Sequence, residues 1–388
     1  MRKICVVSGS RADYWLLKPV ILKLNQSKKI SLKVVLTGAH LLTEECQVRD
    51  DLNASGITDI KRIDCVIDSD EAVAVTKSLG IGIIGFADLL HIFSPDLVVV
   101  LGDRYEILAA VNACLLFGIP VGHIHGGEVT IGAFDDAIRH SVTKMSHLHF
   151  VSTEKYRDRV IQLGENPDNI FNCGSLGVEN LKNTVLVGRE DLETKLQIKF
   201  QNVNILITFH PVTLGAVPSI TALNELLHSV SKIPDACLIF TAPNVDPEGK
   251  RLRARIIDFV EKDQRRYFFE SLGATNYFSM LKQVDCVLGN SSSGIIEAPS
   301  LGVGSINIGE RQDGREMSDS VISCGPVSDE IDEALKRVLS NDFRSSICIA
   351  DNLHEYDQTS AKITEILERF PLKKITQKKF FDLDRITK

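Results

Sequence analysis

The stretch from residue 95 to residue 140 decides the fold: it contains PDLVVVLGDR (95–104), IPVGHIHGGE (119–128) and FDDAIRH (134–140). Leu97–Leu101 and Pro120–Ile124 are short apolar runs, a pattern typical of parallel strands that are covered on both faces. A helical segment lies between the two runs. The pattern therefore predicts a doubly wound α/β fold built on a parallel sheet.

Ionisable residues follow both of these strands. In open α/β sheets, ligands bind in the crevice beyond the carboxyl ends of the strands. We therefore expect one cleft to collect Asp103, Arg104, His123, His125, Glu128, Asp135, Asp136, Arg139 and His140. The alternative is that these residues are loop charges and helix caps, since Asp commonly begins helices. That alternative suits Asp103 alone better than the whole cluster, because two imidazoles and a carboxylate around a Gly-Gly turn are costly to place without a use.

Composition excludes several classes of protein. The chain has 388 residues, of which 44% are hydrophobic, and a net charge of -7, which argues against a nucleic-acid partner. No apolar run reaches membrane-spanning length and no signal peptide is recognisable, so no membrane partner is expected. The nine cysteines are scattered without a Cys-x-x-Cys pair. They indicate reduced core residues of a cytoplasmic protein.

Strand and helix patterns alternate along the whole chain, which predicts two Rossmann-like doubly wound domains with an interdomain cleft. We place the first domain at residues 1–175, a connecting region at 176–200, the second domain at 201–359, and a terminal helix and tail at 360–388. A helix is expected over Thr76–His91 despite three closely spaced glycines. The glycines indicate either tight packing or a break in this helix.

Anion-binding signals occur in both domains. In the first, Arg11 lies at a turn between a strand and a helix, and His40 follows the second strand. In the second, the loop GNSSSG (289–294) joins a strand to a helix, and such loops can hold phosphate through N–H and hydroxyl donors. Glu297, placed in the first turn of that helix, suits a ribose diol. Its alternative role is to compensate the helix dipole.

These motifs together resemble the hydrolysing UDP-N-acetylglucosamine 2-epimerases of sialic-acid-type sugar synthesis. The resemblance runs from Ile4 to about Glu368 and rests on SRAD (10–13), LGDR (101–104), HIHGGE (123–128), DDAIRH (135–140), FHP (209–211), GNSSSG (289–294) and GERQ (309–312). It implies a GT-B-like pair of domains, with UDP held mainly by the second and the sugar by the first.

The resemblance also assigns roles to individual residues. Asp103 and the acids Asp135 and Asp136 match catalytic carboxylates, and Glu128 and His125 belong to the same motif group. The positions that resemble substrate-binding residues, for UDP and sugar, are Arg11, His40, Arg104, Arg139, His140, His210, Asn244, Ser291, Ser292, Glu297 and Arg311.

Two positions depart from the usual family pattern. Many relatives carry Glu where this chain has His125, and a small residue followed by Lys where it has Trp15-Leu16. We therefore expect His125 to replace the Glu in proton transfer, and the assignment of base and acid stays open. The implied reaction removes the C2 proton, expels UDP to form a glycal, and adds water to give the free 2-epimer.

Other functions remain open at this point. A GT-B glycosyltransferase, a non-hydrolysing epimerase and a nucleotide-sugar-binding protein would share the UDP signals. The donor sugar is either UDP-N-acetylglucosamine or UDP-N,N'-diacetylbacillosamine. We expect no cofactor and no metal, because Arg and helix N-termini can supply the charge that diphosphate departure needs. Apolar helices in the first half predict a homodimer or homotetramer.

Overall fold

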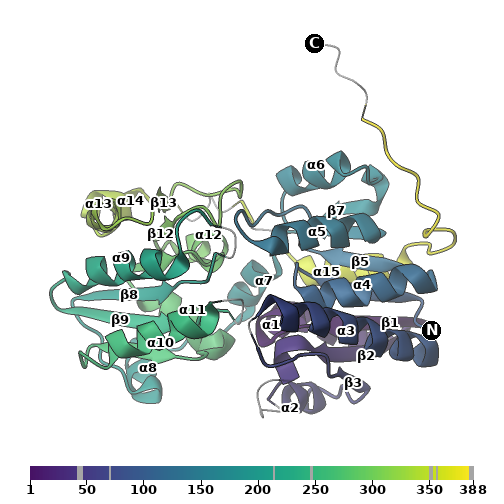
Figure 1. Cartoon of the computed structure of the whole chain (residues 1–388). Coiled ribbons are helices and arrows are strands. Elements are labelled where there is room, and N and C mark those ends of the chain that lie inside the picture. The colour runs from purple at the N-terminus through teal and green to yellow at the C-terminus, as the bar shows by residue number, and fades with distance from the viewer. Residues whose placement is uncertain are drawn as a thin grey trace. The chain divides into compact units, whose positions relative to one another are not determined.

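The computed structural model describes residues 1–41, 47–69, 71–212, 215–244, 248–348, 353–354 and 357–383. The chain divides into two compact units (Figure 1). Unit 1 consists of Met1–Glu128, Asp135–Asn180 and Tyr356–Lys388, and unit 2 of Val129–Phe134 and Leu181–Glu355. The last part of the chain thus returns to the unit in which the chain begins.

Unit 1 is built on a parallel sheet with the strand order β3-β2-β1-β4-β5-β6-β7. Helices cover both faces of this sheet (Figure 1), which explains why β4 is apolar along its whole length. The strands are β1 (Arg2–Ser8), β2 (Ile30–Thr37), β3 (Ile60–Ile63), β4 (Leu97–Leu101), β5 (Val121–Ile124), β6 (Leu148–Val151) and β7 (Ile170–Asn172). The helices are α1 (Arg11–Gln26), η1 (Gly38–Leu41), α2 (Gln47–Ala54), α3 (Ala72–Phe93), α4 (Tyr105–Phe117), α5 (Phe134–Met145), α6 (Glu154–Gln162), η2 (Pro167–Asn169), α7 (Leu176–Asn183) and α15 (Thr359–Arg369).

Helix α3 is continuous, so its glycines do not mark a break, and two of the three, Gly82 and Gly85, mark tight packing. A Cβ atom at Gly82 would lie 3.0 Å from the Cβ of Ala109, and one at Gly85 would lie 2.6 Å from a methyl group of Ile63. Among the described residues, α3 is the one helix long and apolar enough to cross a membrane by length and composition. The expectation that no apolar run reaches that length is therefore wrong. The buried residues of α3, from Ala74 to Leu90, nevertheless face the core of unit 1, as in a helix that covers a sheet.

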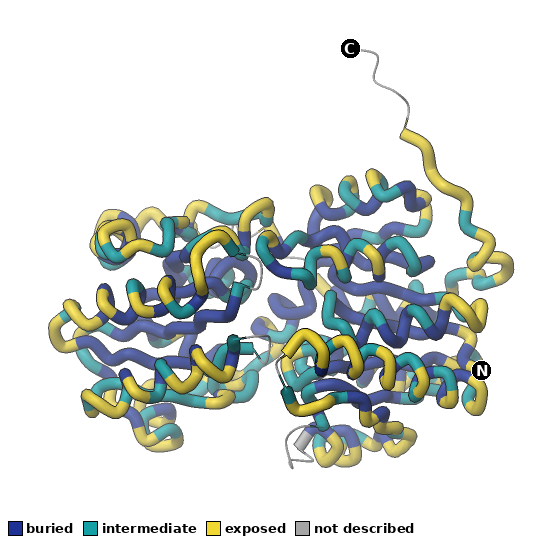
Figure 2. The backbone as a smooth tube through the Cα atoms, in the orientation of Figure 1, coloured by how far each residue is buried: buried dark blue, intermediate teal, exposed yellow. Residues whose placement is uncertain are grey.

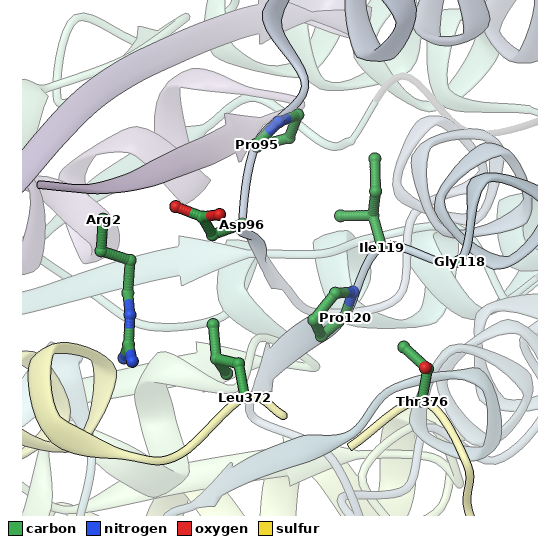
Figure 3. A pocket seen from close by; sticks show the side chains of 8 residues that line it. All are labelled: Arg2, Pro95, Asp96, Gly118, Ile119, Pro120, Leu372 and Thr376. Carbon is green, nitrogen blue, oxygen red and sulfur yellow. The ribbon is translucent and has the colours of Figure 1, made fainter. Parts of the chain in front are cut away.

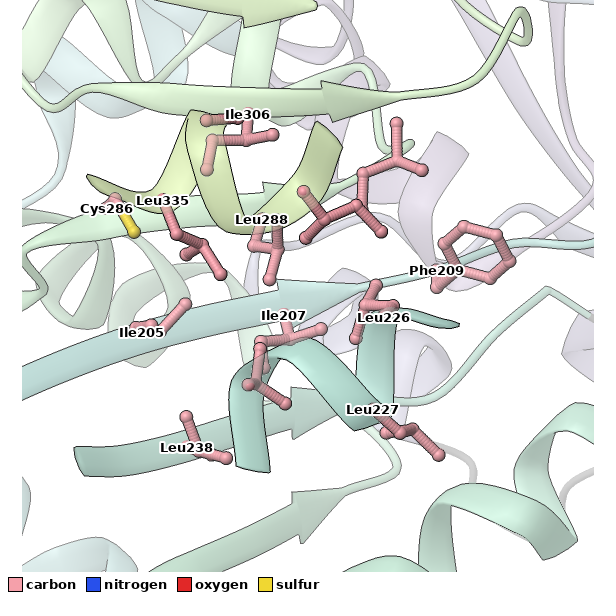
Figure 4. Packing of buried hydrophobic residues seen from close by; sticks show 14 of the residues in the cluster. Ile205, Ile207, Phe209, Leu226, Leu227, Leu238, Cys286, Leu288, Ile306 and Leu335 are labelled. Atoms are coloured by element: carbon pink, nitrogen blue, oxygen red, sulfur yellow. The ribbon is translucent and has the colours of Figure 1, made fainter. Parts of the chain in front are cut away.

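Unit 2 repeats the architecture with a parallel sheet in the order β10-β9-β8-β11-β12-β13. Aliphatic side chains of β8, β9, β11 and β12 pack against the helices on one face (Figure 4). The strands are β8 (Val203–Thr208), β9 (Ala236–Thr241), β10 (Arg266–Phe269), β11 (Cys286–Gly289), β12 (Ser305–Ile308) and β13 (Val321–Cys324). The helices are α8 (Arg189–Leu196), α9 (Ser219–Ser231), α10 (Gly249–Val260), α11 (Gly273–Gln283), α12 (Ser293–Ile296), η3 (Pro299–Leu301), α13 (Ser328–Val338) and α14 (Asn341–Ser346).

The carboxyl-terminal segment is anchored in unit 1. Ile363 and Leu367 of α15 are buried in the same core as Ile4 and Leu17. Figure 2 shows that the buried parts of the backbone lie mainly in the strands and that the exposed parts lie mainly in the helices and loops around them. Farther along, Lys378 forms an ion pair of 2.6 Å with the buried Glu165. The sequence predicted only a polar tail here, because a single lysine gives no sign that it will meet a buried carboxylate.

Candidate active site

Each sheet has a topological switch point. There, the strands that follow the first strand of the sheet in sequence are added on one side, and the later strands are added on the other side. In unit 1 this point lies between β1 and β4, and in unit 2 between β8 and β11. Loops that leave the carboxyl ends of two such strands run in opposite directions and open a crevice between them. The expected site residues Arg11 and Asp103 follow β1 and β4, and His210 and Ser291 follow β8 and β11.

A buried guanidinium organises the site of unit 1. Arg139, on α5, is 5% exposed and forms an ion pair with Asp103 after β4. It also donates a hydrogen bond of 2.9 Å to the carbonyl oxygen of His125 and lies 3.8 Å from the carboxylate of Glu128. Burial opposes the charge on Arg139, but Asp103 and Glu128 raise its pKa, so it stays cationic. The structure therefore brings together four residues that the sequence singled out.

His125 is held with one ring nitrogen available. Its Nδ1 lies 2.8 Å from Oε1 of Glu128, and its buried Nε2 has no hydrogen-bond partner among the described residues. If Nδ1 donates to the carboxylate, Nε2 carries the lone pair and can accept a proton. The backbone of His125 has φ 64°, a left-handed conformation that is uncommon for residues other than glycine and that recurs at active sites and in turns.

The acids of the DDAIRH motif belong to α5 itself. The sequence placed the start of this helix near Ile138, but α5 begins at Phe134, so Asp135 and Asp136 occupy its first turn. Asp136 pairs with His140 one turn later, at 3.6 Å. The carboxylates of Asp135 and Asp136 both raise the pKa of Arg139. Asp135 and Asp136 thus lie close enough to Arg139 to act on it electrostatically, while His140 faces Asp136.

His123 has a supporting role. Its side chain is completely buried, with Nε2 2.8 Å from the carbonyl oxygen of Gly102 and Nδ1 3.1 Å from the hydroxyl of Thr143. Burial lowers its pKa to about 3, so the ring is neutral and fixes the turn that precedes Asp103.

A second acidic group in unit 1 was not identified from the sequence. Arg104 donates to the fully buried Glu106, whose carboxylate packs against Gly9 and would clash with a side chain there. Asp13 is close to both, and its Oδ2 is buried without a hydrogen-bond partner among the described residues. Burial raises the pKa of Asp13 to about 7. The Ser10-x-x-Asp13 spacing is that of an ordinary helix cap, so it gives no sign that Asp13 is buried close to Glu106.

His40 lies beside the same strand end. Its Nε2 is 2.9 Å from the hydroxyl of Ser8, the last residue of β1. Burial, and secondarily the charge of Arg11, lowers the pKa of His40 to about 4. His40 is therefore a neutral hydrogen-bonding residue near Arg11 at physiological pH.

The site of unit 2 is organised by an amide. The side chain of Asn290, completely buried after β11, accepts a hydrogen bond from the backbone N–H of His210 at 2.7 Å and donates one to its carbonyl oxygen at 2.9 Å. Arg311 donates to the backbone carbonyl of Asn290 at 3.1 Å. The N–H of Asn244 donates to Nδ1 of His210 at 3.1 Å. Burial and the charge of Arg311 keep the pKa of His210 well below its ordinary value.

The serine loop that follows β11 leads into a helix of one turn. Glu297 closes this helix at its carboxyl end and is not in its first turn, so the sequence-based placement was wrong and dipole compensation does not explain the residue. Ser291 and Ser292 are half-buried before α12. Burial, together with the nearby Glu297, raises the pKa of Tyr277.

A separate pocket lies at the amino-terminal ends of the strands of unit 1, where β4 and β5 begin (Figure 3). Its lining includes Arg2, Asp96, Pro120 and Leu372, and Arg2 donates to a carbonyl oxygen of the terminal segment. None of the site residues predicted from the sequence lines this pocket. It is distinct from the switch-point site of unit 1.

Two parallel-sheet domains with polar loops at both switch points form the GT-B-like architecture of nucleotide-sugar enzymes. A Neisseria meningitidis UDP-GlcNAc 2-epimerase solved with UDP-GlcNAc superposes with a TM-score of 0.77 at 22% identity, covering 94% of this chain and 99% of that one. A Staphylococcus aureus MnaA–UDP structure superposes with a TM-score of 0.78 at 19% identity, covering 95% and 96%. These likenesses confirm the predicted fold.

Sequence comparison defines the family. The model of the UDP-N-acetylglucosamine 2-epimerase family matches residues 22–368, and the chain belongs to this family. A hydrolysing GDP/UDP-N,N'-diacetylbacillosamine 2-epimerase of Campylobacter jejuni is 36% identical, over 98% of this chain and 99% of the relative. Polysialic acid biosynthesis protein P7 of Escherichia coli is 34% identical over 100% and 99%. A hydrolysing UDP-N,N'-diacetylbacillosamine 2-epimerase of Legionella pneumophila is 32% identical over 96% and 97%.

Proposed function

We propose that this chain is a hydrolysing 2-epimerase that converts a UDP-linked 2-acetamido sugar to the free 2-epimer and UDP through a glycal. The observation that carries the proposal is the buried group of Asp103, Arg139, His125 and Glu128, which combines acids, a basic ring nitrogen and a fixed positive charge. Such a group is costly to bury and is typical of acid–base chemistry.

The unit 1 residues would handle the protons. Glu128 orients His125 so that Nε2 can take or return a proton, and Asp103, fixed by Arg139, supplies a second proton-transfer group. Elimination breaks the C2–H bond and the bond between C1 and the UDP oxygen. Water then returns a hydroxyl to C1 and a proton to the opposite face of C2.

The unit 2 residues would bind the nucleotide. The hydroxyls and N–H groups of the loop after Asn290, together with Arg311, suit a diphosphate. The carboxylate of Glu297 suits a ribose diol. Stabilising the charge that builds on departing UDP contributes several kcal/mol to such a reaction, on the order of 3–4 for one well-placed donor.

Two donors are candidates for the substrate. The expectation from the sequence is UDP-N-acetylglucosamine, which gives N-acetylmannosamine for sialic-acid-type synthesis, and the family description supports it. UDP-N,N'-diacetylbacillosamine, used on the legionaminic acid route, is the second candidate. It is favoured by the names of the Campylobacter and Legionella relatives.

Incubating the pure protein with each donor in D₂O, without an acceptor, tests the proposal. We expect UDP and a free 2-epimer with one deuterium at C2, and a higher kcat/KM for one donor. A UDP-linked epimer would instead identify a non-hydrolysing epimerase. An unchanged donor that turns over only when an acceptor is added would identify a glycosyltransferase, and binding without any turnover would reject catalysis. The Asp103→Asn variant serves as the inactive control.

A further inference from the structure

One short segment of the chain, Val129–Phe134, belongs to unit 2, although the residues on both sides of it belong to unit 1. We call it the crossing segment. Glu128 precedes it and Asp135 follows it, and both are candidate catalytic residues. Whatever holds the crossing segment therefore restrains these two carboxylates through a few backbone bonds.

The side chain of Arg315 holds the crossing segment. Its Nε donates a hydrogen bond of 2.7 Å to the carbonyl oxygen of Val129, and its Nη2 donates one of 3.3 Å to the hydroxyl of the buried Thr130. The N–H of Ala133 donates to the carbonyl oxygen of Thr130 at 3.2 Å and closes a turn in which Gly132 has φ 75°. A planar guanidinium that makes two such bonds fixes the direction of the segment as well as its position.

Two glycines allow the crossing segment to pack closely within unit 2. A Cβ atom at Gly314 would lie 3.0 Å from a methyl group of Val129. A Cβ atom at Gly132 would lie 2.9 Å from a methyl group of Val212, two residues after His210. The crossing segment thus contacts both loops of unit 2 that carry candidate nucleotide-binding residues.

The turn that bears Arg315 is also tied to the candidate nucleotide site. Arg311 and Gln312 lie in the same turn and donate to the backbone carbonyl oxygen of Asn290, at 3.1 and 2.8 Å. The N–H of Arg315 donates to the carbonyl oxygen of Gln312 at 3.2 Å, and Gln312 is completely buried. A series of hydrogen bonds therefore leads from Asn290, where the serine loop begins, to the backbone next to Glu128.

We propose that Arg315 is a positioning residue that couples occupancy of the nucleotide site in unit 2 to the placement of Glu128 and Asp135 in unit 1. The inference rests on the proposed function, because it takes UDP as the ligand of unit 2 and proton transfer as the task of unit 1. UDP that orders the serine loop restrains the turn at residues 309–315, and Arg315 passes this restraint to the crossing segment. Arg315 thereby differs from the residues assigned to UDP itself, since its loss should lower turnover and leave UDP affinity nearly unchanged.

Hydrogen exchange of the full chain, measured by mass spectrometry with and without UDP, tests the coupling. In the wild type, UDP should slow exchange of the amides at residues 129–134 by about fivefold or more. Arg315→Met should lose this protection, while calorimetry gives a Kd for UDP within about threefold of the wild type. Arg337→Met, at an exposed arginine on α13 of the same unit, should keep the protection.

Turnover provides a second readout. Arg315→Met should lower kcat by about 10- to 100-fold with little change in KM, because misplaced groups slow the chemical step more than they weaken binding. Arg315→Lys keeps the charge but not the planar pair of donors, so both its protection and its kcat should be intermediate. Circular dichroism checks that each variant is folded, and the Lys variant carries the test if the Met variant is not.

The outcomes separate this inference from the proposed function. UDP binding without protection of residues 129–134, or protection that survives unchanged in the Arg315 variants, would overturn the coupling and leave the proposed function intact. Equal kcat in Arg315→Met and the wild type would overturn the positioning role. A wild-type chain that does not bind UDP would overturn the proposed function, and the coupling with it.

Discussion

The two units share a topology but differ in what they place at the switch point. Unit 1 buries charged and titratable groups there: Arg139 with Asp103, His125 with Glu128, and Arg104 with Glu106. Unit 2 pairs the side-chain amide of Asn290 with the backbone of His210, and Arg311 donates to the backbone carbonyl oxygen of Asn290. One fold thus provides the same crevice twice with different chemistry.

The difference indicates a division of labour. Buried charges are costly unless their protonation states are used, whereas amides and backbone N–H groups bind anions without titrating. Under the proposed function, variants in unit 1 should therefore affect turnover, and variants in unit 2 should affect UDP affinity.

The largest effect is expected at Asp103. An amide is isosteric with the carboxylate but cannot take a proton, so Asp103→Asn should lower kcat by a factor on the order of 10²–10⁴. UDP affinity measured by calorimetry should stay within about twofold, because UDP contacts are assigned to unit 2. Asp64→Asn, at a carboxylate that is 75% exposed, is the matched control. Near-normal turnover of Asp103→Asn would transfer the role to Asp135, Asp136 or Glu128.

Variants of His125 and Glu128 should show which residue transfers the proton and which one only orients its neighbour. We expect His125→Ala to lower kcat about 100-fold, and Glu128→Gln only about 10-fold, because the amide oxygen can still accept from Nδ1. Replacing His125 by Glu, the residue common in relatives, should recover part of the activity. Equal losses in His125→Ala and Glu128→Gln would show that Glu128 does more than orient the ring.

In unit 2, removing the carboxylate of Glu297 should weaken UDP binding. Glu297→Ala loses a charge-assisted hydrogen bond, which costs about 1.5–3 kcal/mol, or roughly 10- to 150-fold in Kd. The kcat at saturating substrate should change much less than in Asp103→Asn. Glu261→Ala, at an exposed carboxylate of the same unit, is the control. Unchanged UDP affinity in Glu297→Ala would contradict the division of labour.

The last effect concerns stability as a function of pH, and not turnover or UDP binding. Because burial raises the pKa of Asp13 to about 7, the folded protein keeps a proton that the unfolded chain has lost between about pH 4 and pH 7. Asp13 therefore lowers stability as the pH rises through this window. The free energy of unfolding of Asp13→Asn should rise relative to that of the wild type by about 2–3 kcal/mol between pH 5 and pH 8, as measured by urea unfolding. A difference that is constant with pH would show that Asp13 does not hold that proton.

Much of the fold could be predicted because its signals are local. The apolar runs of β4 and β12 and the helix over α3 have periodicities that burial on both faces or one face imposes. Strand β3 and helix α13 were not predicted. The strand IKRI carries two exposed charged residues at a sheet edge, so its pattern does not distinguish it from a loop.

The sequence predicted which residues belong to the site better than it predicted how they contact one another. Strand ends identified Asp103, His125 and Glu128, but their shared partner Arg139 arrives from a helix ten or more residues later. The burial of Asp13 depends on Glu106 and Arg104, which follow a different strand. Such contacts depend on packing between distant segments, which no local spacing records.

The return of the chain to unit 1 has a consequence for its synthesis. Ile363 and Leu367 complete the core that begins with Ile4 and Leu17, and all of unit 2 is made between them. On the ribosome, the first 180 residues therefore emerge without the helix that covers one face of their sheet. Unit 2 can close as soon as it leaves the exit tunnel, whereas unit 1 must wait for translation to reach α15. The half of the molecule translated first is thus the half that finishes folding last.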